Sequence, residues 1–143
     1  MKVEQWGRDA LEKKQTEMGF PNQNQFSEYL GLTMARLTVV LNNPGSARAG
    51  LIAQYGRKVG VQFVIGSGEV KVMNKVQDFT RLRESSGLSM RALAKATGLT
   101  LLTMFNLEHG KSKGGSTARN ILAVSKVLGC AIGFSPKYFE SIK

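Results

Sequence analysis

The sequence has little of the chemistry that enzymes and metal proteins use. Its one cysteine, Cys130, cannot form an internal disulfide or a cysteine metal cluster. Its one histidine, His109, has no cysteine or carboxylate cluster near it at metal-ligand spacing, and it supplies no Ser/His/Asp set. The glycine-containing runs at residues 66–68 and 113–116 lack the spacing of a phosphate-binding loop, so they indicate turns. We therefore expect no cofactor, no metal and no enzymatic activity.

Long apolar runs are also absent. No run approaches the roughly 18 residues that a membrane-spanning helix needs, and the N-terminus lacks the apolar stretch of a signal peptide. The hydrophobic content of 42% is nevertheless too high for a disordered polycation. A chain of 143 residues can form one ordinary domain or two very small ones. We therefore expect a folded, cytoplasmic protein with no membrane partner.

Acidic residues are scarce, because 10 Asp and Glu stand against 20 Lys and Arg, which gives a net charge of +10. Residues 1–72 carry 9 basic and 6 acidic side chains, whereas residues 73–143 carry 11 and 4. The net charges of the two segments are thus +3 and +7. Such an excess favours a polyanionic partner, with nucleic acid before a membrane surface. A solvated basic face is the alternative.

Apolar residues at helical spacing, separated by Gly and Pro, predict a mainly helical chain. In the first part of the chain we expect helices at about residues 3–18, 22–30, 34–42 and 47–59. Residues 61–65 and 70–72 have strand composition and flank Gly-Ser-Gly-Glu, which predicts a β-hairpin. The order of helices then recurs at about residues 76–86, 89–97, 100–108 and 116–128, followed by a strand at 130–134 and a short amphipathic tail.

The recurrence is visible in the residues themselves. Gly31-Leu32-Thr33 and Gly98-Leu99-Thr100 are identical and 67 positions apart, and Gly60 and Gly129 each precede a strand-like run. The pattern indicates an internal duplication. We expect two tandem units: residues 1–72, ending in the β-hairpin, and residues 73–143, ending in a strand and the tail. Strands 61–65 and 130–134 should be neighbours, because apolar strand edges need cover, and the chain would then be a pseudo-dimer.

Two short helices joined by a Gly-Leu-Thr turn are suited to reading DNA. Gly98 ends the first helix without steric penalty, Leu99 fills the crossing between the helices, and the Thr100 hydroxyl caps the second helix. The second helix can then present its N-terminal residues to the major groove. An ordinary helical hairpin has the same spacing and remains the alternative.

A longer stretch carries a family resemblance. The run from Leu82-Arg83-Glu84 through Leu88-Ser89-Met90, Leu93-Ala94 and Gly98, followed by Leu107-Glu108-His109-Gly110, resembles the phage-repressor helix-turn-helix family. This family is also called lambda-repressor-like or xenobiotic-response-element. The match covers about residues 76–129, and the first copy resembles the family only through its alignment to the second. The resemblance implies five-helix DNA-binding domains, usually in dimeric regulators, and the strand at 130–134 is similar to the dimerising strand of antitoxin-type members.

The resemblance also implies where DNA would be contacted. The first residue of the second helix is commonly a Gln in the family, whereas this chain has Met90 there and Gln23 at the aligned position of the first copy. Base reading would fall to Leu101, Leu102, Thr103 and Asn106, with Gln23 and Arg36 in the first copy. Asn106 can bond to adenine and Arg36 to guanine, whereas the leucines can contact only thymine methyls.

Phosphate contacts are expected from the basic residues and from helix ends. The expected set is Arg83, Met90, Arg91, Lys95, Thr100, His109, Lys111, Lys113 and Arg119. A plain surface charge is the alternative for each basic residue. Leu101 and Leu102 have a second interpretation as well, because they could be buried against the other repeat or against a protein partner.

These patterns together predict a sequence-specific regulator of transcription that binds double-stranded DNA, such as a repressor of a phage, plasmid or antitoxin-type operon. It would act as a homodimer or as an intramolecular pseudo-dimer, by occluding a promoter or recruiting a partner. Two alternatives remain. One is an adaptor or antitoxin that grips a protein such as a toxin through the apolar helix faces, and the other is a nonspecific architectural DNA binder.

Overall fold

The computed structural model describes residues 2–112 and 115–142. Over these residues the protein is 60% helical, with nine α-helices and one small sheet, which confirms the mainly helical prediction. The N-terminal half consists of β1 (Lys2–Gln5), α1 (Arg8–Glu17), α2 (Gln23–Leu30), α3 (Met34–Asn42), the short 3-10 helix η1 (Pro44–Ser46), α4 (Ala49–Val59) and β2 (Val61–Ile65). The C-terminal half consists of β3 (Val70–Met73), α5 (Gln77–Ser85), α6 (Met90–Thr97), α7 (Leu101–His109), α8 (Ala118–Leu128), β4 (Ala131–Phe134) and α9 (Pro136–Glu140).

The four strands form one sheet in the order β1-β2-β4-β3, in which each half contributes two neighbouring strands. At the centre β2 and β4 are antiparallel, with Val64 opposite Gly133 and Ile65 opposite Ile132. The expected contact between residues 61–65 and 130–134 is therefore confirmed. The outer pairs, β1 with β2 and β3 with β4, are both parallel. The order of parallel and antiparallel pairs is thus the same from either edge of the sheet, as an internal two-fold arrangement requires.

The predicted β-hairpin of residues 61–65 and 70–72 is wrong. β3 pairs with β4 instead of β2, with Val70 opposite Ala131 and Val72 opposite Gly133. The reason is that β3 opens the C-terminal half as β1 opens the N-terminal half, and each pairs with the strand that closes its own half. The Gly-Ser-Gly-Glu turn at residues 66–69 is consequently the connection between the halves.

The predicted helix at residues 3–18 is also wrong at its start. Lys2–Gln5 is an edge strand in parallel register with β2, from Lys2 opposite Val61 to Gln5 opposite Val64. The backbone N–H of Trp6 continues this ladder by donating to the Val64 carbonyl at 2.6 Å. Gly7 is then the N-terminal cap residue of α1. Pairing with β2 satisfies backbone groups that a longer helix would have satisfied internally.

Buried apolar side chains form one continuous core through both halves. In the N-terminal half Leu11, Leu30, Leu37 and Tyr55 lie in this core and are essentially inaccessible to solvent. Burial raises the pKa of Tyr55 to about 12, although the nearby Arg36 charge acts in the opposite direction. The core continues through the sheet, so the halves are joined by apolar packing as well as by strand pairing.

The halves also meet at the starts of α4 and α8. Arg48 and Thr117 form an isolated antiparallel bridge between these two helix starts. The Ala49 N–H donates to the Ser116 carbonyl at 3.0 Å, and the Ala118 N–H donates to the Ala47 carbonyl at 2.8 Å. Each half therefore supplies one N–H donor and one carbonyl acceptor, so the contact between the two helix starts has the same two-fold symmetry as the sheet.

Candidate nucleic-acid interface

The two predicted tight turns are present and have the same geometry. Gly31 follows α2 with φ 77° and Gly98 follows α6 with φ 75°, a left-handed conformation that favours glycine. Thr33 then accepts a hydrogen bond from the Arg36 N–H at 3.2 Å, and Thr100 accepts one from the Thr103 N–H at 3.1 Å. Both hydroxyls thus cap the following helix, as the sequence predicted.

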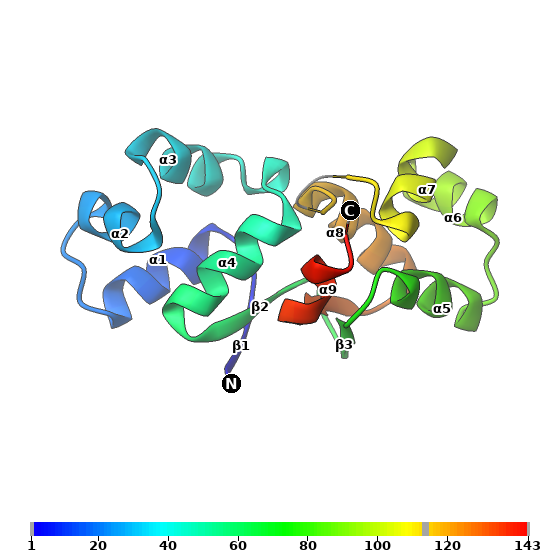
Figure 1. The fold of residues 1–143 in the computed structure, drawn as a ribbon, viewed down its shortest axis with the longest axis horizontal. Coiled ribbons are helices and arrows are strands. Elements are labelled where there is room, and N and C mark those ends of the chain that lie inside the picture. Colours follow the sequence, from blue (N-terminus) through cyan, green and yellow to red (C-terminus); the bar gives the residue numbers. More distant parts are fainter. Residues whose placement is uncertain (1, 113–114, 143) are drawn as a thin grey trace.

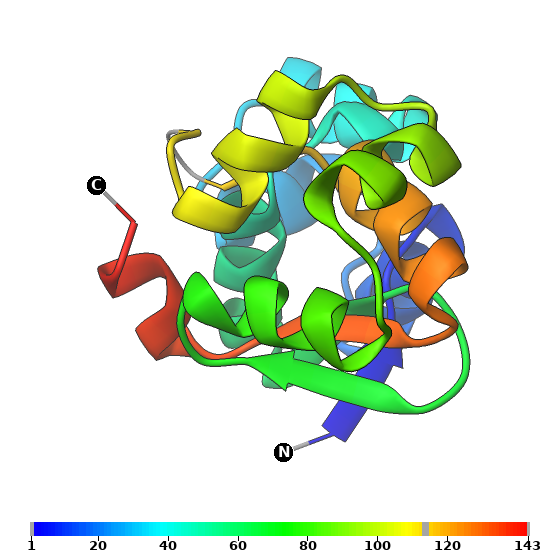
Figure 2. The same cartoon turned by 90° about the vertical axis from the view of Figure 1, so that its right-hand side faces the viewer.

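The helices that follow these turns, α3 and α7, lie on the same side of the molecule. In Figure 1 both run along the upper edge, whereas β1 and β3 lie lower. Figure 2 gives the same arrangement after a quarter turn, with α3 and α7 above the strands. The sheet and the seam between α4 and α8 connect the two halves that carry these helices. One face of the protein therefore presents both helices at once.

On α7 the expected base-reading residues form a largely apolar surface. Leu101 is 44% exposed and Leu102 is 69% exposed. Thr103 and Asn106 are half-buried, and the Thr103 hydroxyl is engaged by Thr100 at 2.8 Å. Phe105, which sequence reasoning did not include, is 42% exposed and stacks on His109 with ring centroids 4.0 Å apart. The exposed leucines are thus not covered by the N-terminal half.

On α2 and α3 the expected readers are Gln23 and Arg36. Gln23 is half-buried at the first position of α2, and Arg36 is exposed. Met34 and Val39 are exposed on the same helix as Arg36. The N-terminal half therefore offers one guanidinium group among apolar neighbours.

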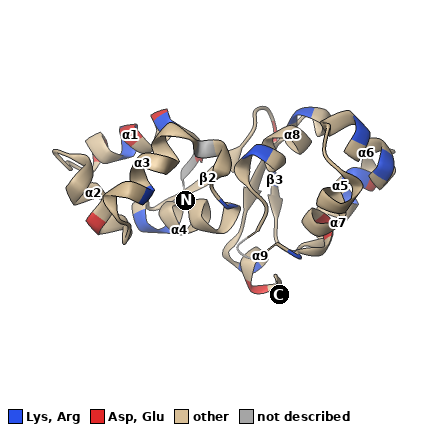
Figure 3. Ribbon diagram, turned by 90° about the horizontal axis from the view of Figure 1, so that it is seen from above, with Lys and Arg blue, Asp and Glu red and all other residues tan. Residues whose placement is uncertain are grey.

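Most of the expected phosphate-binding residues are exposed on the C-terminal half. Arg91 and Lys95 lie on α6, Lys111 follows α7, and Arg119 lies in the first turn of α8. Figure 3 shows blue segments on α6 and α8 at this end of the molecule. Thr100 is exposed at the start of α7. Lys113 lies outside the described residues.

Two members of the expected set are less suited to that role. His109 is exposed, but its Nδ1 lies 2.9 Å from the Phe105 carbonyl, which leaves Nε2 as the ring nitrogen that could reach a ligand. Met90 is half-buried and packs against the core, so its side chain is a structural one.

Arg83 does not fit the expected set of phosphate-binding residues. Its Nε donates to Glu108 Oε2 at 2.9 Å and its Nη1 donates to the Leu88 carbonyl at 2.8 Å. Thr80 completes the cluster by donating to Glu108 Oε1 at 2.7 Å. The Arg83 and Glu108 side chains are only 11% and 1% exposed. This pair ties α5 to the end of α7, so Arg83 holds the helix pair in place and is not free to bind a phosphate.

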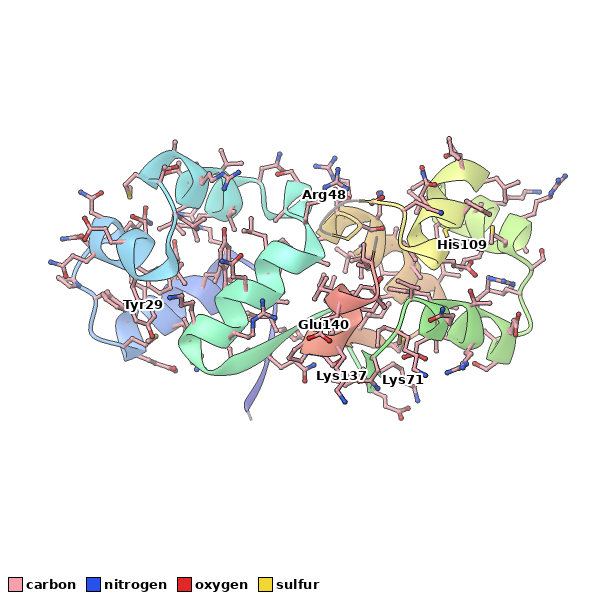
Figure 4. All side chains as sticks on the ribbon, viewed as in Figure 1. Tyr29, Arg48, Lys71, His109, Lys137 and Glu140 are labelled. Carbon is pink, nitrogen blue, oxygen red and sulfur yellow. The ribbon has the colours of Figure 1, made fainter. Side chains whose placement is uncertain are left out.

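Arg48 is a candidate that sequence reasoning missed. It stands at the seam between the halves, where its Nη1 donates to the Gly115 carbonyl at 3.3 Å. Figure 4 shows it at the upper centre of the molecule, between the two helix pairs. Arg119 has a similar place, with its Nη2 at 3.3 Å from Asn43 Oδ1 of the other half. The internal repeat could have drawn attention to Arg48, because Arg48 aligns with Thr117. Each of the two is the N-terminal cap residue of its helix, α4 or α8.

Within residues 2–112 and 115–142, no three His, Cys, Asp or Glu side chains are grouped so that they could hold a metal ion. Over the same residues, no helix combines the length and apolar character needed to cross a membrane. Cys130 is buried, and that burial raises the pKa of its thiol.

Comparisons with known proteins returned no match: no protein-family model, no curated protein and no solved structure is similar to this chain. The resemblance to repressor-type proteins therefore depends on the residues quoted above and on the geometry of the two helix pairs.

Proposed function

We propose that the protein is a sequence-specific regulator that binds double-stranded DNA through two tandem helix-turn-helix units, α2–α3 and α6–α7. The observation that carries this proposal is the common face of α3 and α7, each preceded by the same capped turn and related by an internal two-fold arrangement. DNA-binding dimers use this symmetry to reach two successive major grooves. Here one chain would supply both halves, as an intramolecular pseudo-dimer.

The charge of the chain agrees with this partner. The excess of ten positive charges favours association with a polyanion, and the exposed Arg91, Lys95, Lys111 and Arg119 can neutralise phosphates around α6 and α7. Arg48 adds a guanidinium group between the two helix pairs. No bond is made or broken in this role, so the protein would act by occluding a promoter or by recruiting a partner, as a repressor of a phage, plasmid or antitoxin-type operon does.

The target should consist of two unlike half-sites. α3 presents Met34, Ala35 and Arg36 where α7 presents Leu101, Leu102 and Thr103. Because each base pair offers its own pattern of donors, acceptors and methyl groups in the major groove, different side chains select different bases. The operator is therefore expected to lack the palindromic symmetry that a homodimer requires.

One observation favours a second candidate function. Leu101, Leu102 and Phe105 form an apolar patch on α7, and such patches often bind proteins. In this alternative α7 would grip a protein partner, for example a toxin, while the basic residues remain a solvated face.

Selection from a random duplex library with the purified full-length chain tests the proposal. The expected result is an enriched, asymmetric site that outcompetes random duplex at physiological salt by at least about a thousandfold. Equal affinity for selected and random duplex would leave an architectural binder, and no binding to either would favour the protein-partner alternative.

A further inference from the structure

A cleft lies at the junction of the two halves, on the side of the sheet covered by α4. Its volume is about 200 Å³. α4 contributes Ile52, Ala53 and Arg57, and β2 contributes Phe63. The end of β4 contributes Phe134, and the connection into α9 contributes Ser135. α4 and α9, which both carry lining residues, lie near the middle of Figure 1. A ligand in this cleft would therefore touch both halves.

The lining is mainly apolar and includes two aromatic side chains. A dry cavity of about 150 Å³ is sufficient to hold benzene, so this one has room for an aromatic ring with a short substituent. Three polar side chains interrupt the apolar lining: Arg57, Gln62 and Ser135. The Gln62 amide donates to the Phe134 carbonyl at 2.9 Å, and the Ser135 hydroxyl is buried. Arg57 is exposed and forms no ion pair in the described part of the chain, so its guanidinium group is accessible to a ligand.

A guanidinium group at the mouth of an apolar cleft suits a carboxylate, which it can bind through two parallel hydrogen bonds. From the volume, the apolar lining and the Arg57 guanidinium group, we propose that the cleft binds a small aromatic monocarboxylate. The ring would occupy the space beside Ala53 and Phe63, and the carboxylate would meet Arg57.

The internal repeat provides a matched control. Ala53 and Arg57 on α4 correspond to Leu122 and Lys126 on α8, at the same spacing of 69 positions. Those two residues line a second hollow, but that one is bounded largely by Gly66, Ser67, Gly68 and Gly129 and offers fewer apolar side chains. The larger leucine at the position of Ala53 also suggests how to fill the first cleft. Ala53→Leu introduces the side chain that the other half already carries.

The test is calorimetric titration of the full-length protein with phenylacetate, with phenylacetamide as the uncharged probe. Phenylacetate should bind in the micromolar to millimolar range, and phenylacetamide should bind at least about tenfold more weakly. Arg57→Gln should weaken phenylacetate by a similar factor, and Ala53→Leu should abolish binding. Lys126→Gln should leave the affinity unchanged. Backbone amide NMR spectra report whether each variant is folded and whether the perturbed residues surround the cleft.

No binding of phenylacetate at millimolar concentrations would overturn the proposal. So would equal binding to Arg57→Gln or Ala53→Leu in folded form, or a loss of binding in Lys126→Gln. Because the titration contains no DNA, its result is independent of the proposed DNA-binding function.

Discussion

The two halves share an order of elements, but their helix pairs differ in the contacts that hold them and in the side chains that they expose. In the C-terminal half the buried Arg83–Glu108 ion pair joins α5 to α7, whereas the N-terminal half has Thr16 and Leu41 at the positions 67 residues earlier, which cannot form an ion pair. Lys14 pairs with Glu17 at 2.9 Å and Glu4 at 3.4 Å, within the N-terminal segment itself. The comparison teaches that the helix after the turn is tied by a buried ion pair in one copy but not in the other, where the buried charge of Lys14 pairs within the N-terminal segment.

The largest difference is expected when the buried pair is broken. Glu108→Ala removes the partner of Arg83 and leaves a guanidinium group buried, which should cost about 3–5 kcal/mol of unfolding free energy. Lys14→Ala in the other half should cost less, because Glu17 remains accessible to water. Urea unfolding of both variants measures this. Equal losses would show that the halves are anchored alike.

A second prediction separates the halves in DNA binding. Asn106→Ala removes the polar reader of α7 and should weaken binding to the selected site by about 1–3 kcal/mol. Arg36→Ala should cost less, because the C-terminal half carries more of the charge that positions the chain on DNA. Competition titrations at fixed salt give both values. An Arg36→Ala loss as large as that of Asn106→Ala would contradict this ranking.

A third prediction concerns what the halves have in common. Gly31→Ala and Gly98→Ala each force an alanine into a left-handed conformation, which should cost about 1–2 kcal/mol. An added Cβ meets no other atom within 4 Å at either position, so backbone strain is the whole effect. The two losses in a urea titration should therefore agree. A clear difference between them would mean that the turns are not equivalent.

The smallest effect is a pH dependence in the C-terminal half. Burial of Asp78 acts to raise the pKa of its carboxyl, but the N–H groups of Asn74 and Lys75, together with Arg81, outweigh it, so the pKa lies below its usual value of 3.8. A carboxyl with a lowered pKa stabilises the fold above the unfolded-state pKa and loses that contribution as pH falls through its folded-state pKa. The gap in stability between the wild type and Asp78→Asn should therefore be full at neutral pH and shrink below about pH 4. A gap that stays constant with pH would contradict this assignment.

The sequence predicts the local features of this fold better than its pairings. The two Gly-Leu-Thr turns and the threonine caps that follow them are predicted by the spacing alone. The neighbouring central strands also follow, because two apolar strands in related positions need cover. These features depend on a few adjacent residues or on the repeat.

The failures have a common physical cause, which is that distant residues decide them. β2 and β3 look like a hairpin because a glycine-rich turn joins them, but β3 finds its partner in β4, about 60 residues later. The four-residue strand β1 is too short to show alternation and depends on β2 for its hydrogen bonds. In the sequence Arg83 resembles an ordinary surface charge. Only the folded chain brings it to Glu108, 25 positions away, in a buried ion pair. Strand pairing and ion pairing of this kind are set by tertiary context.

The most direct test of the central claim is a footprint of the full-length chain on its selected duplex, with the stoichiometry measured on the same complex. One chain per duplex should protect two unlike half-sites about one helical turn apart, near 10 base pairs from centre to centre. Protection of a single half-site, two chains on a palindrome, or equal protection of random duplex would contradict the claim that one chain reads DNA through both of its halves.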